Sequence, residues 1–251
     1  MKVDAVIKMF KRSLGNLGVR YRNYIENGDS KTYSGILKAA SYGDIEVMKK
    51  ECIGHVQKRI GKRLRECVNK TTIETEDKNG KKRQKKVLGG KGKLTSRIMN
   101  TLTVYYGSAI RRHCDSVENM SNAIWASYYH NCSTDDNPQH DKCESGEDSW
   151  CSWQKARALG TLSSYEHDYQ PLPPDVAEAI LPIYTDLSNE KLLERCVGGF
   201  TQNNNESYNQ LIWNLTTRAS DHRSVDLTLI TFSLHPPMIY HHVKWLLQKH
   251  P

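Results

Sequence analysis

The sequence lacks three features that would place it in common classes of protein. It has no run of about 18 apolar residues, the length that a membrane-spanning helix needs. Its first residues, "MKVDAVIKMFKRS", are amphipathic and charged, and contain neither the apolar core nor the cleavage site of a secretory signal. Its seven cysteines cannot all pair in disulfides. These absences predict an intracellular protein in a reducing compartment, with no membrane partner.

Acidic residues are scarce in one long part of the chain. The formal net charge is +8, and from Lys49 to Arg97 basic residues outnumber acidic ones by roughly three to one. Such a cluster favours phosphate backbones or an acidic protein surface, and a solvated loop or a nuclear-import signal is the alternative for 81–86. We expect a nuclear protein. The predicted DNA-binding residues are Lys58, Arg59, Lys62, Arg63, Lys81, Lys82, Arg83, Lys85, Lys86, Lys91 and Lys93.

Hydrophobic spacing predicts an α/β part followed by a mainly helical part. The segment 70–92 is polar and rich in Gly and Lys, and predicts a flexible loop or linker. The tail from about residue 217 fits neither part. The expected strands lie at 19–25 and within 44–56, and the expected helices at 3–15, 31–40, 55–70, 93–113, 116–130, 170–184 and 203–217.

Two motifs lie where the expected strands end. Asp29 follows the first strand in "YIENGDSKTY", a position suited to a divalent cation in an open α/β sheet, although a turn or helix-cap role is the commoner alternative. Cys52 and His55, in "CIGH", follow the second strand with the spacing of zinc ligands. Two ligands do not make a site, and a packing pair is the alternative.

Glu206 opens a predicted helix in "QNNNESYNQLIW". A carboxylate in the first turn of a helix is the ordinary response to the helix dipole, so the motif alone does not indicate catalysis.

A compact block of cysteine and histidine occupies residues 130–151. Thiolate and imidazole ligands in one short, loop-like window suit tetrahedral zinc. His130 is an alternative to Cys132 as a ligand, and cysteines buried under a loop are the competing interpretation. The predicted zinc ligands are Cys132, His140, Cys143 and Cys151.

Taken together, the motifs resemble those of the Mutator-like transposases, in the form common among arthropod and other animal elements. The matching segments run in family order from about residue 2 to residue 215, and their conjunction is highly specific. They are "YRNYIENGDSKTY", "ECIGHVQKRIGKRL", "GGKGKLT", "YYGSAIRR", "AIWASYYH", "NPQHDKCESGEDSWCSWQKA" and "TQNNNESYNQLIW".

The resemblance implies an RNase H-like catalytic core interrupted by a helical insertion, with an Asp-Asp-Glu triad. Such a triad binds two Mg²⁺ (or Mn²⁺) ions that cut and join strands of transposon-end and target DNA. Asp29 matches the second aspartate of the family, Glu206 matches the third acid, and Cys52 with His55 matches its Cys-x2-His motif. A homo-oligomer is a further expectation.

The first aspartate of the family lies on an earlier strand, and Asp4 is in a helical pattern that cannot replace it. We therefore expect a transposase remnant truncated at its N-terminus and inactive as given, because the ions must hold the attacking and the leaving oxygen in line. The alternative is a non-catalytic DNA-binding protein derived from a transposase. The expected domains are 1–69 (α/β, with the second Asp), 70–93 (basic loop), 94–200 (helical insertion), 201–216 (helix with Glu206) and 217–251 (atypical tail).

Overall fold

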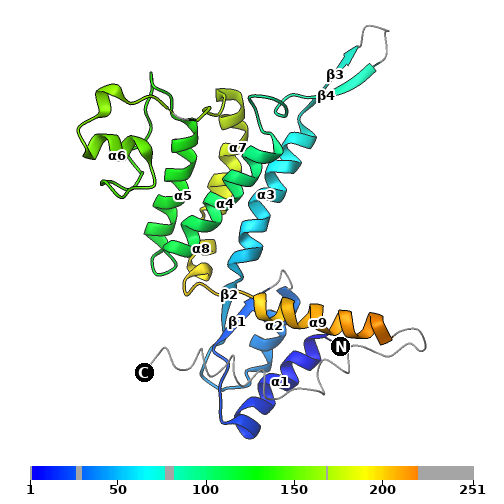
Figure 1. The fold of residues 1–251 in the computed structure, drawn as a ribbon. Helices are drawn as coiled ribbons and strands as arrows, with labels where there is room; N and C mark the ends of the chain where they lie inside the picture. Colours follow the sequence, from blue (N-terminus) through cyan, green and yellow to red (C-terminus); the bar gives the residue numbers. More distant parts are fainter. Residues whose placement is uncertain (1, 27–29, 77–81, 168, 220–251) are drawn as a thin grey trace. The chain divides into compact units, whose positions relative to one another are not determined.

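A computed structural model describes residues 2–26, 30–76, 82–167 and 169–219 of the chain (Figure 1). The chain divides into two units, residues 1–201 and 202–251, and each is described by itself. The elements of the first unit are α1 (Lys2–Leu17), β1 (Asn23–Glu26), α2 (Ser30–Ala39), β2 (Met48–Glu51), α3 (Ile53–Lys70), β3 (Thr72–Glu76), β4 (Lys82–Lys86), α4 (Ser96–Arg112), α5 (Val117–Cys132), α6 (Ser152–Ala158), the 3-10 turn η1 (Leu162–Ser164), α7 (Pro174–Leu187) and α8 (Glu190–Cys196); the second unit contains α9 (Asn203–Ala219).

The N-terminal part is a small α/β arrangement. Strands β1 and β2 pair in parallel, with Asn23 opposite Met48 and Glu26 opposite Glu51. Helix α2 forms the crossover between them, as a parallel pair requires. A small hydrophobic core in this part of the chain includes Phe10 of α1 and Ile36 of α2. The parallel pairing places the carboxyl ends of both strands at the same edge of the sheet.

The larger core lies between α3, α4, α5 and α7. Helix α3 carries apolar residues at helical spacing, among them Val56, Ile60 and Leu64, all of which are buried. It packs against α4 and α7, so α3 belongs to this helical body, whereas we expected it within the α/β portion. Thr95 and Ser116 cap α4 and α5 by accepting hydrogen bonds from the N–H groups of residues 98 and 119.

Two glycines allow α3 and α4 to approach closely. A Cβ at Gly61 of α3 would lie 2.9 Å from Oγ1 of Thr103 on α4. A Cβ at Gly107 of α4 would clash with the side chain of Gln57 on α3. The helices can adopt this separation because neither position carries a side chain.

The segment expected to be a flexible loop contains a β-hairpin instead. Strands β3 and β4 pair antiparallel, with Thr72 opposite Lys86 and Glu76 opposite Lys82, and the hairpin projects beyond the end of α3 (Figure 1). After β4 the chain returns to the core, where Leu94 N–H donates to the Leu88 carbonyl at 3.0 Å and both side chains are buried. The loop prediction was wrong for these residues because "TIETE" and "KRQKK" pair through their backbones without an apolar face.

The helical body begins and ends at one place in the fold. The N–H of Ile53, the first residue of α3, donates to the Phe200 carbonyl at 3.0 Å. Gly198 N–H donates to the Cys114 carbonyl at 2.8 Å. Since Ile53 follows β2 by two residues, the chain returns to the carboxyl end of β2 after the whole helical body.

A buried carboxylate reinforces this junction. Glu51, at the end of β2, is 3% exposed. Its Oε2 lies 2.6 Å from a guanidinium nitrogen of Arg59 on α3, and its Oε1 lies 3.3 Å from Nε of Arg195 on α8. One side chain therefore joins the strand to two helices.

The described part of the chain is a mixed, helix-rich fold with a small two-stranded parallel sheet and a hairpin. The fold is compatible with the predicted α/β class. Among the helices described, none is both long enough and apolar enough to cross a membrane.

Candidate metal centre and DNA-binding face

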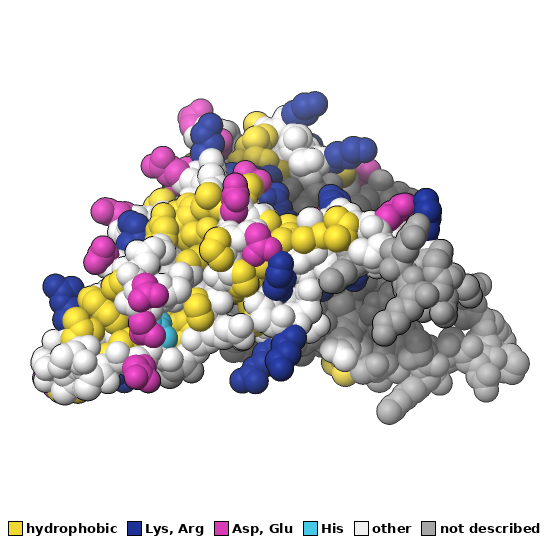
Figure 2. Space-filling view, turned by 90° about the horizontal axis from the view of Figure 1, so that it is seen from above, with side chains coloured by type: hydrophobic (Ala, Val, Ile, Leu, Met, Phe, Trp, Pro, Cys, Tyr) yellow, Lys and Arg dark blue, Asp and Glu magenta, His cyan; other side chains and the backbone are white. Residues whose placement is uncertain are grey.

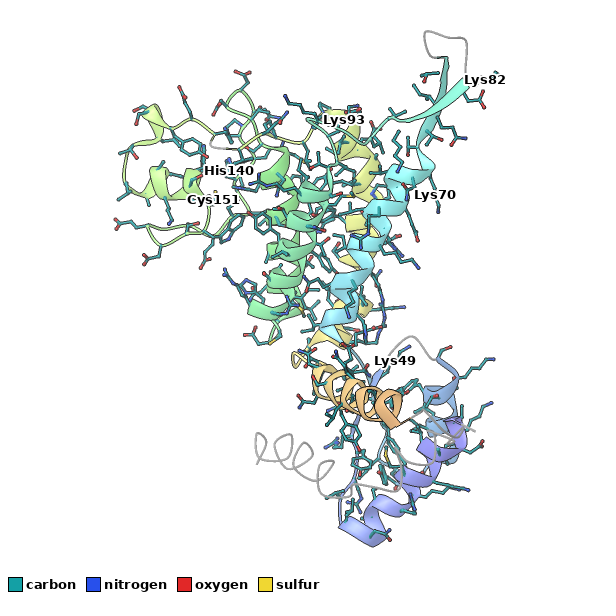
Figure 3. All side chains as sticks on the ribbon, turned by 45° about the vertical axis from the view of Figure 1, so that its right-hand side comes forward. Lys49, Lys70, Lys82, Lys93, His140 and Cys151 are labelled. Carbon is teal, nitrogen blue, oxygen red and sulfur yellow. The ribbon has the colours of Figure 1, made fainter. Side chains whose placement is uncertain are left out.

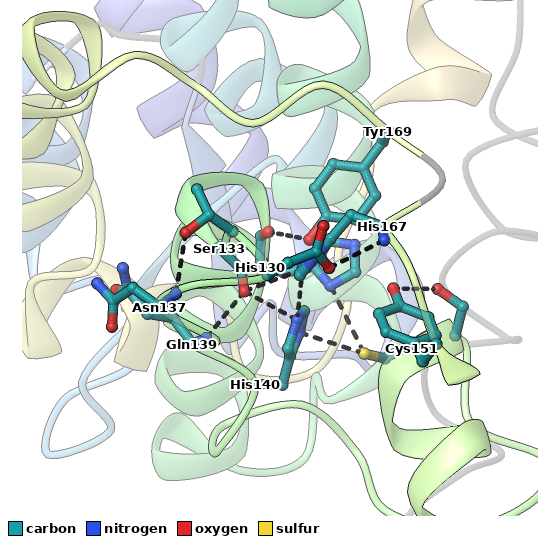
Figure 4. A network of polar contacts seen from close by, with 12 residues as sticks. His130, Ser133, Asn137, Gln139, His140, Cys151, His167 and Tyr169 are labelled. Carbon is teal, nitrogen blue, oxygen red and sulfur yellow. Dashed lines mark hydrogen bonds and ion pairs between the residues drawn. The ribbon is translucent and has the colours of Figure 1, made fainter. Parts of the chain in front are cut away.

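Four buried side chains converge beside the end of α5. Two histidines and two cysteines place one ligand atom each within 4.8 Å of all the others. His130 comes from α5, Cys151 immediately precedes α6, and the other two come from the loop between these helices. Figure 4 shows His130, His140 and Cys151. The group, named the metal cluster below, is His130, His140, Cys143 and Cys151.

The spacing of the cluster fits a tetrahedral ion. Zn–S bonds of about 2.3 Å and Zn–N bonds of about 2.0 Å at tetrahedral angles separate sulfur from nitrogen by about 3.5 Å. The Cys151 sulfur lies 3.6 Å from His130 Nδ1 and 3.4 Å from His140 Nδ1. The Cys143 sulfur lies 3.9 Å and 3.8 Å from the same two nitrogens. The cluster could therefore hold a metal such as zinc through two nitrogen and two sulfur atoms.

The protonation of the cluster also suits a metal. Burial lowers the pKa of His140, which keeps its imidazole neutral and able to donate a lone pair. The hydrogen bond between the two thiols lowers the pKa of Cys151 and raises that of Cys143, since a single thiol proton is shared between the sulfurs. A cation that replaced this proton would satisfy both sulfurs.

The structure selects His130, and not Cys132, as the fourth member of the cluster. The two residues are two positions apart on α5 and therefore lie on different sides of the helix. Cys132 packs against the core between the helices, and its burial raises the pKa of its thiol to about 11. The fold therefore assembles the alternative ligand set, in which His130 replaces Cys132.

Aromatic rings enclose the cluster. The Tyr169 ring stacks on His130 with centroids 4.7 Å apart, and the Trp153 ring stacks on His140 at 5.0 Å. The Tyr169 hydroxyl also donates to the His130 carbonyl at 2.6 Å. His140 is 1% exposed and Cys151 is 0% exposed, so the cluster offers no open position for a substrate.

The described residues contain one of the two predicted catalytic acids. Asp29 lies outside those residues; it follows the last residue of β1, Glu26, by three positions. Glu206 is exposed in the first turn of α9, where its N–H donates to the Gln202 carbonyl at 2.9 Å. Both roles remain predictions.

Cys52 and His55 lie at the start of α3 and take no part in the metal cluster. Cys52 is 2% exposed and directly follows β2. Its carbonyl accepts hydrogen bonds from the N–H groups of His55 and Val56 at 3.0 and 3.1 Å. This first turn of α3 is compatible with the alternative of a packing pair.

The predicted DNA-binding residues fall into two groups. Several are held by carboxylates: Arg59 by Glu51, Arg63 by Asp186 at 2.9 Å and Lys93 by Asp175 at 2.5 Å. On β4, Lys82 lies 3.7 Å from Glu74, and Lys86 donates to the Asn69 side chain at 2.6 Å. Lys81 lies outside the described residues, Arg83 and Lys85 are in β4, and Lys91 is exposed in the following loop.

A basic stripe runs along the exposed side of α3. Lys58, Lys62 and Arg65 are exposed at spacings of four and three residues, which place them on one face, and Lys70 is exposed at the end of the helix. Arg65 and Lys70 were not predicted. The helical spacing 58-62-65 is the signal that would have found Arg65, whereas Lys70 lies outside that spacing. Figure 3 shows Lys70 and Lys82 far from His140 and Cys151.

The region around the metal cluster carries the opposite charge. Figure 2 shows Asp and Glu side chains gathered on the left of the face in view, the side on which Figure 1 draws α6. The exposed acidic residues here include Asp135, Asp136, Asp141, Glu144, Glu147 and Asp148. A phosphate backbone would be repelled by this surface and attracted by α3.

Comparison with known families identifies the class of protein. The family model of the Mutator-like transposases matches residues 1–151, a segment that contains α3 and all four residues of the metal cluster. No curated protein and no solved structure matches the chain. Because the match covers more than half of the sequence, the chain belongs to the Mutator-like transposase family.

Proposed function

We propose that this chain is a transposase-derived protein that binds DNA through the basic stripe of α3. The observation that carries the proposal is the alignment of Lys58, Lys62 and Arg65 on one exposed helix face. The family membership supports a DNA partner. Contacts from lysine and arginine to phosphates do not depend on the base sequence, so the stripe favours sequence-independent affinity for DNA.

The test is the salt dependence of duplex binding by the full chain. Replacing Lys58, Lys62 and Arg65 with alanine should weaken binding and reduce the slope of log K against log salt by about 2 to 3, because each phosphate contact contributes about 0.9. A matched control replaces Lys11, Lys155 and Lys191, which are exposed on other helices, and removes the same charge. Equal losses in both triple variants would mean that net charge, and not the stripe, determines binding.

A second candidate function is metal-dependent strand cleavage, with Asp29 and Glu206 as Mg²⁺ or Mn²⁺ ligands. Two observations favour it. β1 and β2 are parallel, so their carboxyl ends lie at one edge of the sheet, and Asp29 follows β1 by three residues in the sequence. The Phe200 carbonyl accepts from Ile53 N–H, and Glu206 follows Phe200 by six residues.

Cleavage is tested on supercoiled plasmid with Mg²⁺ or Mn²⁺. If the wild-type chain nicks DNA and Asp29→Asn or Glu206→Gln does not, while all three bind DNA equally, the catalytic proposal replaces the binding one. Nicking that persists in both variants would come from another source.

A fluorescent fusion tests the proposed nuclear location, and retention outside the nucleus would contradict it.

We also propose that the metal cluster holds one structural zinc ion. A set of two imidazoles and two thiolates suits zinc, and the burial of all four residues favours a closed site. Elemental analysis of the purified chain should find about one zinc per chain. This ion is separate from the Mg²⁺ expected for catalysis.

A further inference from the structure

We propose that three residues outside the metal cluster are positioning residues, which fix the orientation and tautomer of His140 for a bound ion. They are Ser133, His167 and Asp135, which form a hydrogen-bonded chain from the cluster to the surface (Figure 4). The inference rests on the proposed zinc ion and adds residues that are not ligands.

The series of hydrogen bonds begins at Nε2 of His140, the ring nitrogen that faces away from the cysteines. Its Nδ1 faces the two cysteine sulfurs, so this atom is the one that can donate a lone pair to the ion. Its Nε2 lies 2.9 Å from Ser133 Oγ and 3.1 Å from His167 Nε2. The ring must therefore carry its proton on Nε2, which donates outward.

The second step is the proton arrangement of His167. Its Nδ1 lies 2.5 Å from Asp135 Oδ1, and its backbone N–H donates to the same oxygen at 3.2 Å. These hydrogen bonds hold the pKa of the Asp135 carboxyl below its usual value, as expected for an ionised acceptor. Since a carboxylate accepts, His167 carries its proton on Nδ1 and leaves Nε2 as an acceptor.

Ser133 completes the arrangement. Its Oγ accepts from the backbone N–H of Gln139 at 2.9 Å and from His140 Nε2–H, and its own proton points to His167 Nε2 at 3.2 Å. Ser133 is fully buried, whereas the Asp135 side chain is 60% exposed. Each polar hydrogen in this series therefore has an acceptor. Each donor also points away from the metal cluster, toward the exposed carboxylate of Asp135.

This arrangement has a chemical consequence for the ion. A histidine ligand whose other nitrogen donates to a polarised acceptor is a stronger donor to the metal and loses less entropy on binding, and loss of such a partner weakens metal affinity by about 10- to 100-fold. His167 lies 27 residues from His140 in the sequence. The ion thereby also holds the segment after η1 against the loop before α6.

The test measures zinc affinity by competition with a chelator in three variants of the full chain. His167→Phe keeps an aromatic ring beside His140 and Tyr169 but removes both nitrogens, and should weaken zinc binding about 10- to 100-fold. His167→Gln restores an acceptor near the position of Nε2 and should recover most of the affinity. Tyr165→Phe is the matched control. The Tyr165 hydroxyl forms a hydrogen bond with Ser152 Oγ at 3.0 Å and takes no part in the hydrogen bonds that link His140 to Asp135.

The outcomes separate this inference from the zinc proposal. If the wild-type chain binds no zinc, both proposals fail. If it binds one zinc and His167→Phe binds as tightly, the positioning role is wrong and the structural zinc stands. If His167→Gln binds zinc as weakly as His167→Phe, an acceptor beside His140 Nε2 does not restore the affinity, and the positioning role is overturned. Nitrogen-15 NMR of the zinc-loaded chain should find the His140 proton on Nε2, and a proton on Nδ1 would overturn the inference.

Discussion

The Glu51 bridge offers a stability test whose magnitude follows from the geometry. Glu51→Gln keeps the shape of the side chain and removes its charge. The carboxylate accepts from Arg59 at 2.6 Å and from Arg195 at 3.3 Å. Hydrogen bonds to charged groups contribute about 1.5 to 3 kcal/mol each. The two arginine side chains are 38% and 34% exposed, so water screens them and the lower end of that range applies.

We therefore expect Glu51→Gln to lower the free energy of unfolding by about 2 to 3 kcal/mol. With an m-value of about 1 to 3 kcal/mol per molar urea, the urea midpoint of the helical circular dichroism signal should fall by about 1 M. Glu66→Gln is the control, because Glu66 lies 3.8 Å from Lys62 and both side chains are exposed. It should lose less than about 0.5 kcal/mol. Equal midpoints for the two variants would refute the reasoning.

Three shorter predictions follow from the metal cluster and the helix packing. Cys151→Ser should abolish stoichiometric metal binding in elemental analysis, whereas Cys132→Ser should retain it, since only the former lies in the cluster. Removal of the ion by a chelator should make Cys151 react with iodoacetamide at pH 8; Cys196 should stay unreacted, because burial raises the pKa of its thiol to about 12 and the thiolate is the reacting form. Gly61→Ala should destabilise the chain by about 1 to 2 kcal/mol in urea unfolding, since the clash with Thr103 exceeds the helix propensity gained; a more stable variant would mean that α3 and α4 can separate.

The helices were the most predictable part of the fold. α1, α2, α3, α4, α5, α7 and α9 lie where apolar spacing and capping residues indicated. The short helices α6 and α8, with seven residues each, carry too few turns for a periodic signal and were not predicted. The β3–β4 hairpin was mistaken for a loop because the sequences "TIETE" and "KRQKK" lack the alternation of apolar and polar residues that predicts a strand.

The candidate site was predictable only where its residues are close in sequence. His140, Cys143 and Cys151 share one short window, but the choice between His130 and Cys132 depends on the phase of α5. His167 has no local pattern that links it to the cluster. In the same way, the pairing of Arg63 with Asp186 joins residues 123 positions apart, which no reading of the basic segment could anticipate.

The hydrogen bond between Ile53 and Phe200 has a consequence for how this chain can vary. Residues 54–199 leave the α/β part and come back to it at points separated by one backbone hydrogen bond. A short turn could join the flanking residues without stretching the remaining structure, because loop closure costs little when the ends are already adjacent. The helical body is thus a cassette, and the gain, loss or exchange of this cassette during evolution would leave the edge of the parallel strands in place.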